Sequence, residues 1–182
     1  GLVGSEMCIR DSFWVAPGSM RGWDEIRVSE KMYNEFLKEG RIAENNLYDA
    51  RAYGSMFFDD PYYHEGEHIL GYNYDDVYYE TSVTQYNFRK YMPATWDEQK
   101  QSAVGTNMPL MRYANVLLMQ AEVYNEQKHP EKAIPLINDV RRIHGKLPAM
   151  TGSDYEAVKA QIEHERLVEF ALENSRFYDL RR

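Results

Sequence analysis

The sequence contains a single cysteine, Cys8, in 182 residues. One thiol excludes an internal disulfide and any zinc site built from cysteines. The sequence also has no apolar run of about 18 residues, the length that a bilayer-spanning helix needs. Basic residues are fewer than acidic ones, 21 against 29, and the formal charge is -8. This balance argues against a protein that binds nucleic-acid phosphates, because such proteins need a basic stripe. With 43% hydrophobic residues, the composition is that of a globular protein with an apolar core.

The charge is unevenly distributed and divides the chain. Residues 107–182 contain 11 basic and 11 acidic residues, so the whole acidic excess lies in residues 1–106. Residues 1–12 resemble the translated adapter sequence found at the ends of many metagenomic reading frames, and we expect this segment to be non-native. We therefore predict three regions: the non-native segment 1–12, a helix and loop region over 13–106, and a helical region over 107–182.

The middle region combines one expected helix with loops that are rich in aromatic residues. Ser29 is a candidate N-cap for a helix within residues 20–43, and Gly40 is a candidate stop. Ten of the fifteen tyrosines lie between Tyr48 and Tyr91, where turn-forming residues interrupt every apolar run. Long loops without regular structure are uncommon in compact domains and tend to be functional.

The last region predicts three amphipathic helices. Apolar residues at helical spacing indicate helices over Pro109–Glu126, over His129–Ile143, and from Ser153 onward. Ser153 and Glu156 fit a capping box for the third helix, and Gly145 is a candidate stop for the second. The first two helices have the spacing of a tetratricopeptide-like repeat of about 34 residues. The predicted fold is therefore all-α: a tetratricopeptide-like hairpin scaffold with long, irregular, aromatic-rich loops, forming part of a larger domain.

The third helix places three carboxylates on one stripe. Glu165, Glu169 and Glu173 are spaced four residues apart, so they repel one another unless cations lie opposite. We expect a structural ion-pair network and no catalytic residue. Its predicted members are Arg112, Glu122, Arg141, Glu165, Arg166, Glu169, Glu173, Arg176 and Asp179. The alternative is a glycosidase that uses Glu165 or Glu169, because glycosidases place two carboxyls beside the scissile bond.

Two patterns bear on metal ions. His164-Glu165 begins like the motif of zinc proteases, but position 168 is valine where that motif requires a second histidine. We expect His144 and His164 to be surface histidines. Loop acids supply the oxygen ligands that calcium prefers, without a calcium-loop pattern: Asp59, Asp60, Glu65, Glu67, Asp75 and Asp76. We expect these to be solvated, and we predict no metal and no cofactor.

Three motifs occur in order within residues 109–182. The segment Leu110–Glu122 contains Arg-Tyr-Ala, then Leu-Leu-Met, then Ala-Glu. The segment Ala133–Arg141 ends in Ile-Asn-Asp-Val-Arg. The segment Glu165–Arg182 begins with Glu-Arg, contains two further glutamates, and ends in Arg-Phe-Tyr-Asp-Leu-Arg-Arg. Together they resemble the motifs of the SusD/RagB family. Ile143 departs from the family pattern, which often has a second arginine there.

The resemblance implies an all-helical fold with tetratricopeptide repeats, long loops and no catalytic centre. Asp49-Ala50-Arg51 is similar to an Asp-x-Arg that precedes the loop region in this family. The resemblance also implies a lipid-anchored protein on the outer face of the outer membrane in Bacteroidota. Such proteins bind glycans or other nutrients and cover a TonB-dependent SusC-like transporter. Because family members are far longer and the last motif is cut after Arg182, we expect the C-terminal portion of a longer protein, without its signal and lipid-acceptor cysteine.

Aromatic side chains on loops suit sugar binding, because one face of a pyranose ring is apolar while its hydroxyls need hydrogen bonds. Tyrosine also suits protein interfaces, since it is large, amphipathic and low in rotamer entropy. We therefore predict nutrient capture by the loops, with these candidate stacking residues: Trp23, Tyr62, Tyr63, Tyr72, Tyr74, Tyr78 and Trp96. The alternative is a tetratricopeptide-type adaptor that binds only proteins. Neither hypothesis involves nucleic acid.

Overall fold

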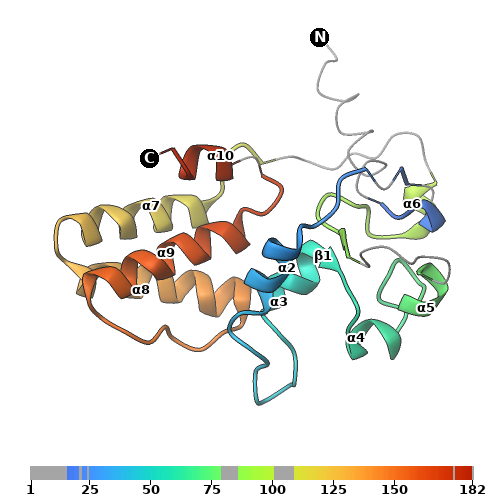
Figure 1. The fold of residues 1–182 in the computed structure, drawn as a ribbon, viewed down its shortest axis with the longest axis horizontal. Coiled ribbons are helices and arrows are strands. Elements are labelled where there is room, and N and C mark those ends of the chain that lie inside the picture. The colour runs from blue at the N-terminus through green and yellow to red at the C-terminus, as the bar shows by residue number, and fades with distance from the viewer. Residues whose placement is uncertain are drawn as a thin grey trace, which may run out of the picture. The chain divides into compact units, whose positions relative to one another are not determined.

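The computed structural model describes residues 16–20, 22–23, 25–78, 86–100, 109–173 and 175–181. These residues are mostly helical and contain one two-stranded sheet, which confirms the predicted all-α class (Figure 1). The expected non-native segment, residues 1–12, lies outside the described residues. Among the helices of the described part, none is long and apolar enough to cross a membrane.

The chain divides into two compact units. The first unit comprises Gly1–Tyr33 and Tyr53–Met108, and the second comprises Asn34–Ala52 and Pro109–Arg182. Residues 34–52 therefore belong with the C-terminal helices, although they lie far from them in sequence. Two helices contain the unit boundaries: α2 (Glu30–Leu37) and α3 (Ala50–Ser55).

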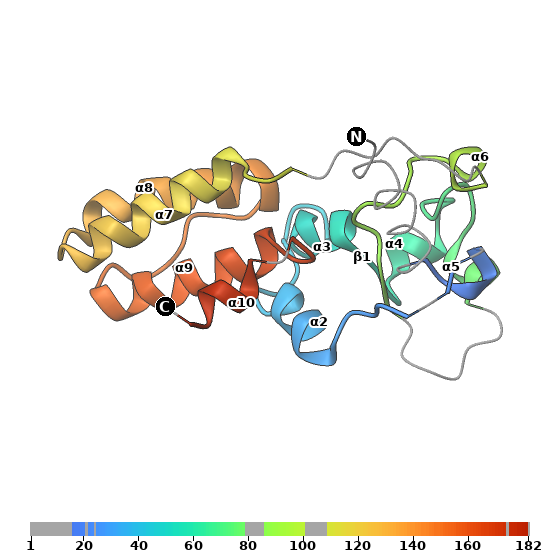
Figure 2. The same cartoon turned by 90° about the horizontal axis from the view of Figure 1, so that it is seen from above.

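Three long helices form the core of the second unit. They are α7 (Tyr113–Glu126), α8 (Pro130–Val140) and α9 (Tyr155–Glu169), which lie side by side in both ribbon views (Figures 1 and 2). Their buried apolar side chains meet in one cluster: Ala114, Leu117, Leu118, Ala121, Ala133, Ile137, Val140, Val158, Ile162 and Phe170. The α7–α8 pair is the tetratricopeptide-like hairpin that the sequence predicts, and α9 covers the face that two helices alone would leave open.

The first of these helices begins later than expected. Arg112 precedes it with extended backbone (φ -117°, ψ 157°), and Leu110 is fully exposed. Pro109 is therefore outside α7. The turn to α8 uses Lys128 in the left-handed region (φ 64°), and Pro130 occupies the first turn of α8, where its missing N–H costs nothing.

The second helix does not run to Ile143 as an α-helix. It ends at Val140 and continues as a π-helix, η2 (Arg141–Gly145). The residue with left-handed backbone that ends this helix is Lys146 (φ 56°), so the predicted stop at Gly145 is wrong. Gly145 is instead needed for packing. A Cβ atom on Gly145 would lie 3.2 Å from both Nη2 of Arg51 and Oδ1 of Asp49. Glycine therefore allows close approach of these side chains.

The cap of α9 differs from the predicted one. Oδ1 of Asp154 accepts hydrogen bonds from the backbone N–H groups of Glu156 (3.1 Å) and Ala157 (3.0 Å). Asp154 has the extended backbone of an N-cap (φ -85°, ψ 167°), so the predicted capping role of Ser153 is wrong. Its carboxylate also lies at the positive end of the helix dipole, which favours a negative charge there.

We expect Asp154→Ala to lower the free energy of unfolding of the second unit by about 1 kcal/mol, since the variant leaves two first-turn N–H groups without their acceptor. Urea denaturation followed by circular dichroism at 222 nm measures this change. Ser153→Ala is the matched control and should change the free energy of unfolding by less than about 0.3 kcal/mol, because Ser153 is exposed and does not cap the helix. Equal losses in the two variants would contradict the assignment.

The first unit is built from short elements. Beside parts of α2 and α3 it contains η1 (Gly18–Met20), α4 (Pro61–His64), α5 (Tyr74–Val77), α6 (Trp96–Gln99), and the antiparallel strands β1 (Met56–Phe57) and β2 (Asn87–Phe88). Side chains cap α4, α5 and α6: Asp60, Asn73 and Thr95, respectively. The predicted cap of α2 is confirmed, because Oγ of Ser29 accepts a hydrogen bond from the N–H of Met32 at 3.2 Å. The second unit also contains a one-turn helix, α10 (Arg176–Asp179).

Candidate functional site

Glu165 lies at the centre of a buried ion-pair network in the second unit. Its side chain is fully buried, and each of its oxygens accepts a hydrogen bond from a guanidinium group. Oε2 lies 2.6 Å from Nη1 of Arg51, and Oε1 lies 2.8 Å from Nη1 of Arg141. Oε1 also accepts a hydrogen bond from Nε2 of Gln161 at 2.8 Å. A carboxylate in this position needs such partners, because an unpaired buried charge is very costly.

Arg51 is a network member that the sequence analysis did not predict. Its guanidinium is also bound by Asp49, with Nη2 2.6 Å from Oδ2. Burial by itself lowers the pKa of Arg51, but the hydrogen bonds and charges of Asp49 and Glu165 outweigh burial and raise it. The only signal in the sequence was the Asp-x-Arg pattern, since 114 positions separate Arg51 from Glu165.

The other two predicted stripe carboxylates contact Arg112, but only Glu169 lies on α9. Glu173 lies past the end of the helix, so the expectation of three carboxylates on one helical stripe is wrong for Glu173. Nη1 of Arg112 lies 2.6 Å from Oε1 of Glu169, and its Nη2 lies 2.7 Å from Oε1 of Glu173. Nδ1 of His144 lies 2.8 Å from the same oxygen of Glu169. Burial tends to raise the pKa of Glu169, but the Arg112 hydrogen bond and the nearby positive charges lower it below its ordinary value. The general acid of a glycosidase needs a raised pKa, so Glu169 does not suit that role.

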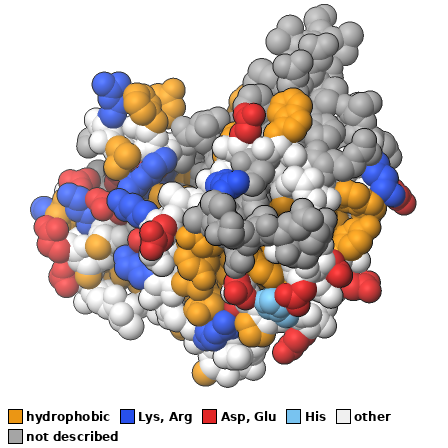
Figure 3. All heavy atoms as spheres, turned by 45° about the vertical axis from the view of Figure 1, so that its right-hand side comes forward, with side chains coloured by type: hydrophobic (Ala, Val, Ile, Leu, Met, Phe, Trp, Pro, Cys, Tyr) orange, Lys and Arg blue, Asp and Glu red, His pale blue; other side chains and the backbone are white. Residues whose placement is uncertain are grey.

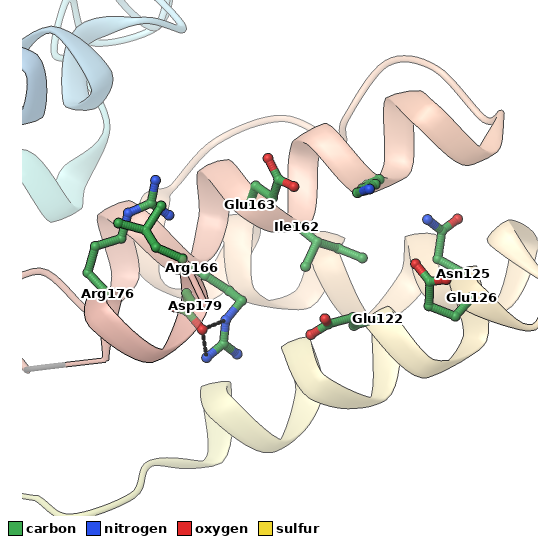
Figure 4. Close-up of a pocket in the computed structure, with 10 residues that line it drawn as sticks. Glu122, Asn125, Glu126, Ile162, Glu163, Arg166, Arg176 and Asp179 are labelled. Carbon is green, nitrogen blue, oxygen red and sulfur yellow. Dashed lines mark hydrogen bonds and ion pairs between the residues drawn. The ribbon is translucent and has the colours of Figure 1, made fainter. Parts of the chain in front are cut away.

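A groove of about 520 Å³ contains the remaining predicted network residues (Figure 4). It lies between α7 and α9 and is closed by α10. Arg166 and Asp179 form an ion pair at 2.9 Å, which Figure 4 marks with dashed lines. Glu122 and Arg176 line the same groove. Arg176, a predicted network member, therefore lies in this groove. The two arginines that contact Glu165 are Arg51 and Arg141.

Three of the predicted stacking residues are buried in the first unit. Tyr63 has no exposed surface, and its hydroxyl lies 2.9 Å from the carbonyl oxygen of Met56. Tyr74 and Tyr78 are 4% and 7% exposed, and their rings stack with centroids 4.5 Å apart. These three rings pack against the protein itself and present no face to a sugar.

Four predicted stacking residues remain at least partly accessible. The face in Figure 3 shows hydrophobic side chains beside acidic ones. Tyr62 is half-buried, and its ring stacks on His68 with centroids 3.9 Å apart. Trp23 is 56% exposed and Tyr72 is 39% exposed. Tyr72 meets the half-buried Trp96 edge to face, with centroids 5.7 Å apart and planes at 83°. Tyr72 and Trp96 are thus two partly accessible candidates whose rings are in contact.

The loop acids bind groups of their own unit. His64 lies between Asp59 (Nε2 to Oδ1, 2.8 Å) and Asp75 (Nδ1 to Oδ2, 3.1 Å), and the hydrogen bonds that its ring donates to Asp59 and to Asp75 raise its pKa. Asp60 caps α4, and Asp76 completes the capping box of α5. Four of the acids considered above as calcium ligands therefore accept hydrogen bonds from neighbouring residues: Asp59, Asp60, Asp75 and Asp76.

The two histidines that the sequence analysis considered as metal ligands, His144 and His164, differ from each other. His144 is exposed, as predicted, and contacts Glu169. The prediction that His164 is a surface histidine is wrong, because its residue surface is only 6% exposed. It lies on the inner side of α9, where Glu35 approaches it from α2.

This architecture is that of a helical-repeat protein: a hairpin and a third helix locked by buried ion pairs, with a separate unit of short elements that presents aromatic side chains. The chain belongs to the SusD family, whose sequence model matches residues 4–182. The match begins within the expected non-native segment 1–12.

Known proteins that are similar to the chain include the following three. A curated SusD-like protein P38 of Formosa agariphila is 34% identical over 83 residues, which are 41% of this chain and 16% of that protein. A crystal structure of a SusD superfamily protein from Bacteroides vulgatus matches with a TM-score of 0.76 and 28% identity, over 92% of this chain and 35% of the other. A SusD-like protein from Bacteroides fragilis matches with a TM-score of 0.54 and 25% identity, over 97% of this chain and 35% of the other. The chain thus spans about a third of the length of the solved relatives.

Proposed function

We propose that this chain is part of a cell-surface protein that captures glycans or similar nutrients and delivers them to a TonB-dependent SusC-like transporter. Membership of the SusD family supports this proposal, because proteins of this family are binding proteins and not enzymes. In the proposal the full protein is a non-catalytic lipoprotein of the outer membrane in Bacteroidota. The second unit is then a scaffold, and the first unit contacts the ligand.

The observation that carries the proposal is the contact between the exposed Tyr72 and the half-buried Trp96. A tight turn positions Tyr72: it exchanges two backbone hydrogen bonds of 3.0 Å with Ile69, and the two residues between them have positive φ (54° and 91°). Trp96 is the first residue of α6, which the Thr95–Glu98 capping box holds in place. The backbone thus fixes the two Cα positions, and the contact between the rings restricts their rotamers, so less rotamer entropy is lost when a ligand binds.

The edge-to-face arrangement forms a corner. A pyranose that stacks its apolar face on one ring would meet the edge of the other. Charged groups for the hydroxyls of a sugar lie beside the corner. Lys100 places Nζ 5.6 Å from the Trp96 ring and 3.0 Å from Oδ1 of Asp97.

We expect the chain to be retarded in affinity electrophoresis by at least one polysaccharide of a panel, and alanine at Tyr72 or Trp96 to weaken that retardation. Removing one aromatic contact costs about 1–2 kcal/mol, or roughly a 5- to 30-fold loss of affinity. Tyr113→Ala is the matched control, since Tyr113 is a 74% exposed tyrosine of the second unit. Equal retardation of Tyr72→Ala, Trp96→Ala and the parent chain would contradict the proposed contact.

The groove between α7 and α9 favours the second candidate function, a tetratricopeptide-type adaptor that binds proteins. Its lining combines acids of α7, such as Glu122 and Glu126, with the bases Lys159 and Arg176, which suits a peptide with both charges. The same electrophoresis decides between the two. The adaptor is the better account if no polysaccharide retards the chain and if the chain binds a peptide that the Lys159→Glu variant no longer binds.

A further inference from the structure

His68 covers one face of the Tyr62 ring in the first unit. The two rings are parallel to within 6°, and their centroids are 3.9 Å apart. Among the residues that the structure describes, the exposed side chain of His68 forms no hydrogen bond and no ion pair. Stacking is therefore the contact that holds this ring, and a stacked aromatic pair changes an equilibrium constant by about 2- to 10-fold. The ring can be displaced at small cost.

Tyr62, in contrast, has a fixed position. It lies in the first turn of α4, where its backbone N–H donates a hydrogen bond to Oδ1 of Asp60 at 3.0 Å. Its ring meets the buried rings of Tyr53 and Tyr63 edge to face, with centroids 4.9 and 5.0 Å away. Tyr62 is therefore a rigid platform whose stacking partner is a weakly held side chain.

Gly66 allows the His68 ring to lie on Tyr62. A Cβ atom on Gly66 would lie 2.6 Å from Cδ2 of the His68 ring and closer still to Nε2, so any other residue at position 66 would displace the ring. Because His68 is exposed, rotation of its side chain is enough to uncover Tyr62, and exposed side chains rotate within nanoseconds.

We propose that Tyr62 is a second sugar-stacking site of the first unit and that His68 is a lid, which a pyranose ring displaces. This inference rests on the proposed function, the capture of glycans. A pyranose that lies parallel to Tyr62 replaces the stacking of His68, and its hydroxyls add hydrogen bonds that the His68 side chain does not make. His68 is thus an intramolecular competitor, because the apparent affinity for the ligand is reduced to the fraction of molecules in which the ring is open.

The lid belongs to the loop that carries Tyr72. Residues 65–73 connect α4 to α5, and they contain both His68 and the hydrogen-bonded pair of Ile69 and Tyr72. Tyr62 lies on the helix that precedes this loop. A ligand that stacks on both Tyr62 and Tyr72 contains at least two sugar rings, so the ligand class that uses both sites is an oligosaccharide or a polysaccharide.

Affinity electrophoresis of the 182-residue chain against the polysaccharide panel tests the lid. We expect His68→Ala to bind about 2- to 10-fold more tightly than the parent, because the competing ring is gone. Gly66→Ala should act in the same way while keeping the histidine, and since the φ of Gly66 is not positive, the backbone accepts alanine. The double variant Tyr62→Ala, His68→Ala should lose the gain. His129→Ala is the matched control: His129 is a 48% exposed histidine of the second unit, and the variant should bind as the parent does.

An NMR measurement follows the lid itself. The Tyr62 ring should shift the ring protons of His68 upfield in the parent, and both Gly66→Ala and a retarding polysaccharide should remove this shift. Tighter binding of His68→Ala than of the parent supports the lid, also where the parent is not retarded. A retarded parent whose affinity His68→Ala and Gly66→Ala leave unchanged overturns the lid and keeps the proposed function. If no polysaccharide retards either the parent or His68→Ala, the lid and the proposed function are both overturned.

Discussion

Glu165→Gln should lower the free energy of unfolding of the second unit by about 3–5 kcal/mol. The substitution preserves the size of the side chain but removes the negative charge that Arg51 and Arg141 share. Both arginines have raised pKa values, so they remain charged in the variant, and each is almost completely buried. Removing one partner of a buried ion-pair network is costly, because Arg51 and Arg141 stay desolvated with one ionic partner fewer each, Asp49 remaining on Arg51 and Glu39 on Arg141.

Urea denaturation followed at 222 nm measures this loss, since α7, α8 and α9 supply most of the helical signal. Glu163→Gln is the matched control: it is the same substitution two residues away on α9, at an exposed position, and should change the free energy of unfolding by less than about 0.5 kcal/mol. A variant at Glu165 as stable as the one at Glu163 would show that the network contributes little. If Glu169→Gln instead abolished a glycosidase activity without loss of stability, the catalytic alternative would return.

The helices of the second unit could be predicted because their pattern is local. Apolar residues at spacings of three and four positions specify α7, α8 and α9, and the stripe of three glutamates requires cations nearby. The sequence could name Arg112 and Arg141, which lie on the same three-helix segment. Arg51 could not be chosen, since no local rule connects residues 114 positions apart.

The aromatic residues show a different limit. Tyrosine is suited both to a core and to a binding surface, so composition alone could not separate Tyr63 from Tyr72. Short helices with side-chain caps decide which rings turn inward, and their positions depend on pairings such as β1 with β2. The predicted cap of α9 is wrong by one residue for a similar reason. Ser153 and Asp154 are both good caps, and only the backbone angles distinguish them.

Tyr63→Ala separates a structural ring from a ligand-binding one, and should destabilise the first unit by about 3–5 kcal/mol. The ring is fully buried and lies edge to face with Phe57 (5.7 Å between centroids) and Phe58 (5.6 Å). Its removal leaves a cavity among aromatic side chains that cannot collapse without moving β1. Tyr63→Phe should cost only about 1 kcal/mol, the net value of the lost hydroxyl hydrogen bond.

Tryptophan fluorescence reports on this unit selectively, because all three tryptophans lie in segments of the first unit: Trp14, Trp23 and Trp96. In Tyr63→Ala the fluorescence transition should move to lower urea, while the transition at 222 nm, dominated by the second unit, should move much less. Tyr72→Ala should leave the free energy of unfolding measured by fluorescence within about 0.5 kcal/mol of the parent value. The same variant should nevertheless weaken glycan binding. The opposite result, a stable Tyr63→Ala that no longer binds polysaccharide, would return Tyr63 to the ligand site and would require the ring to leave its buried position when the ligand binds.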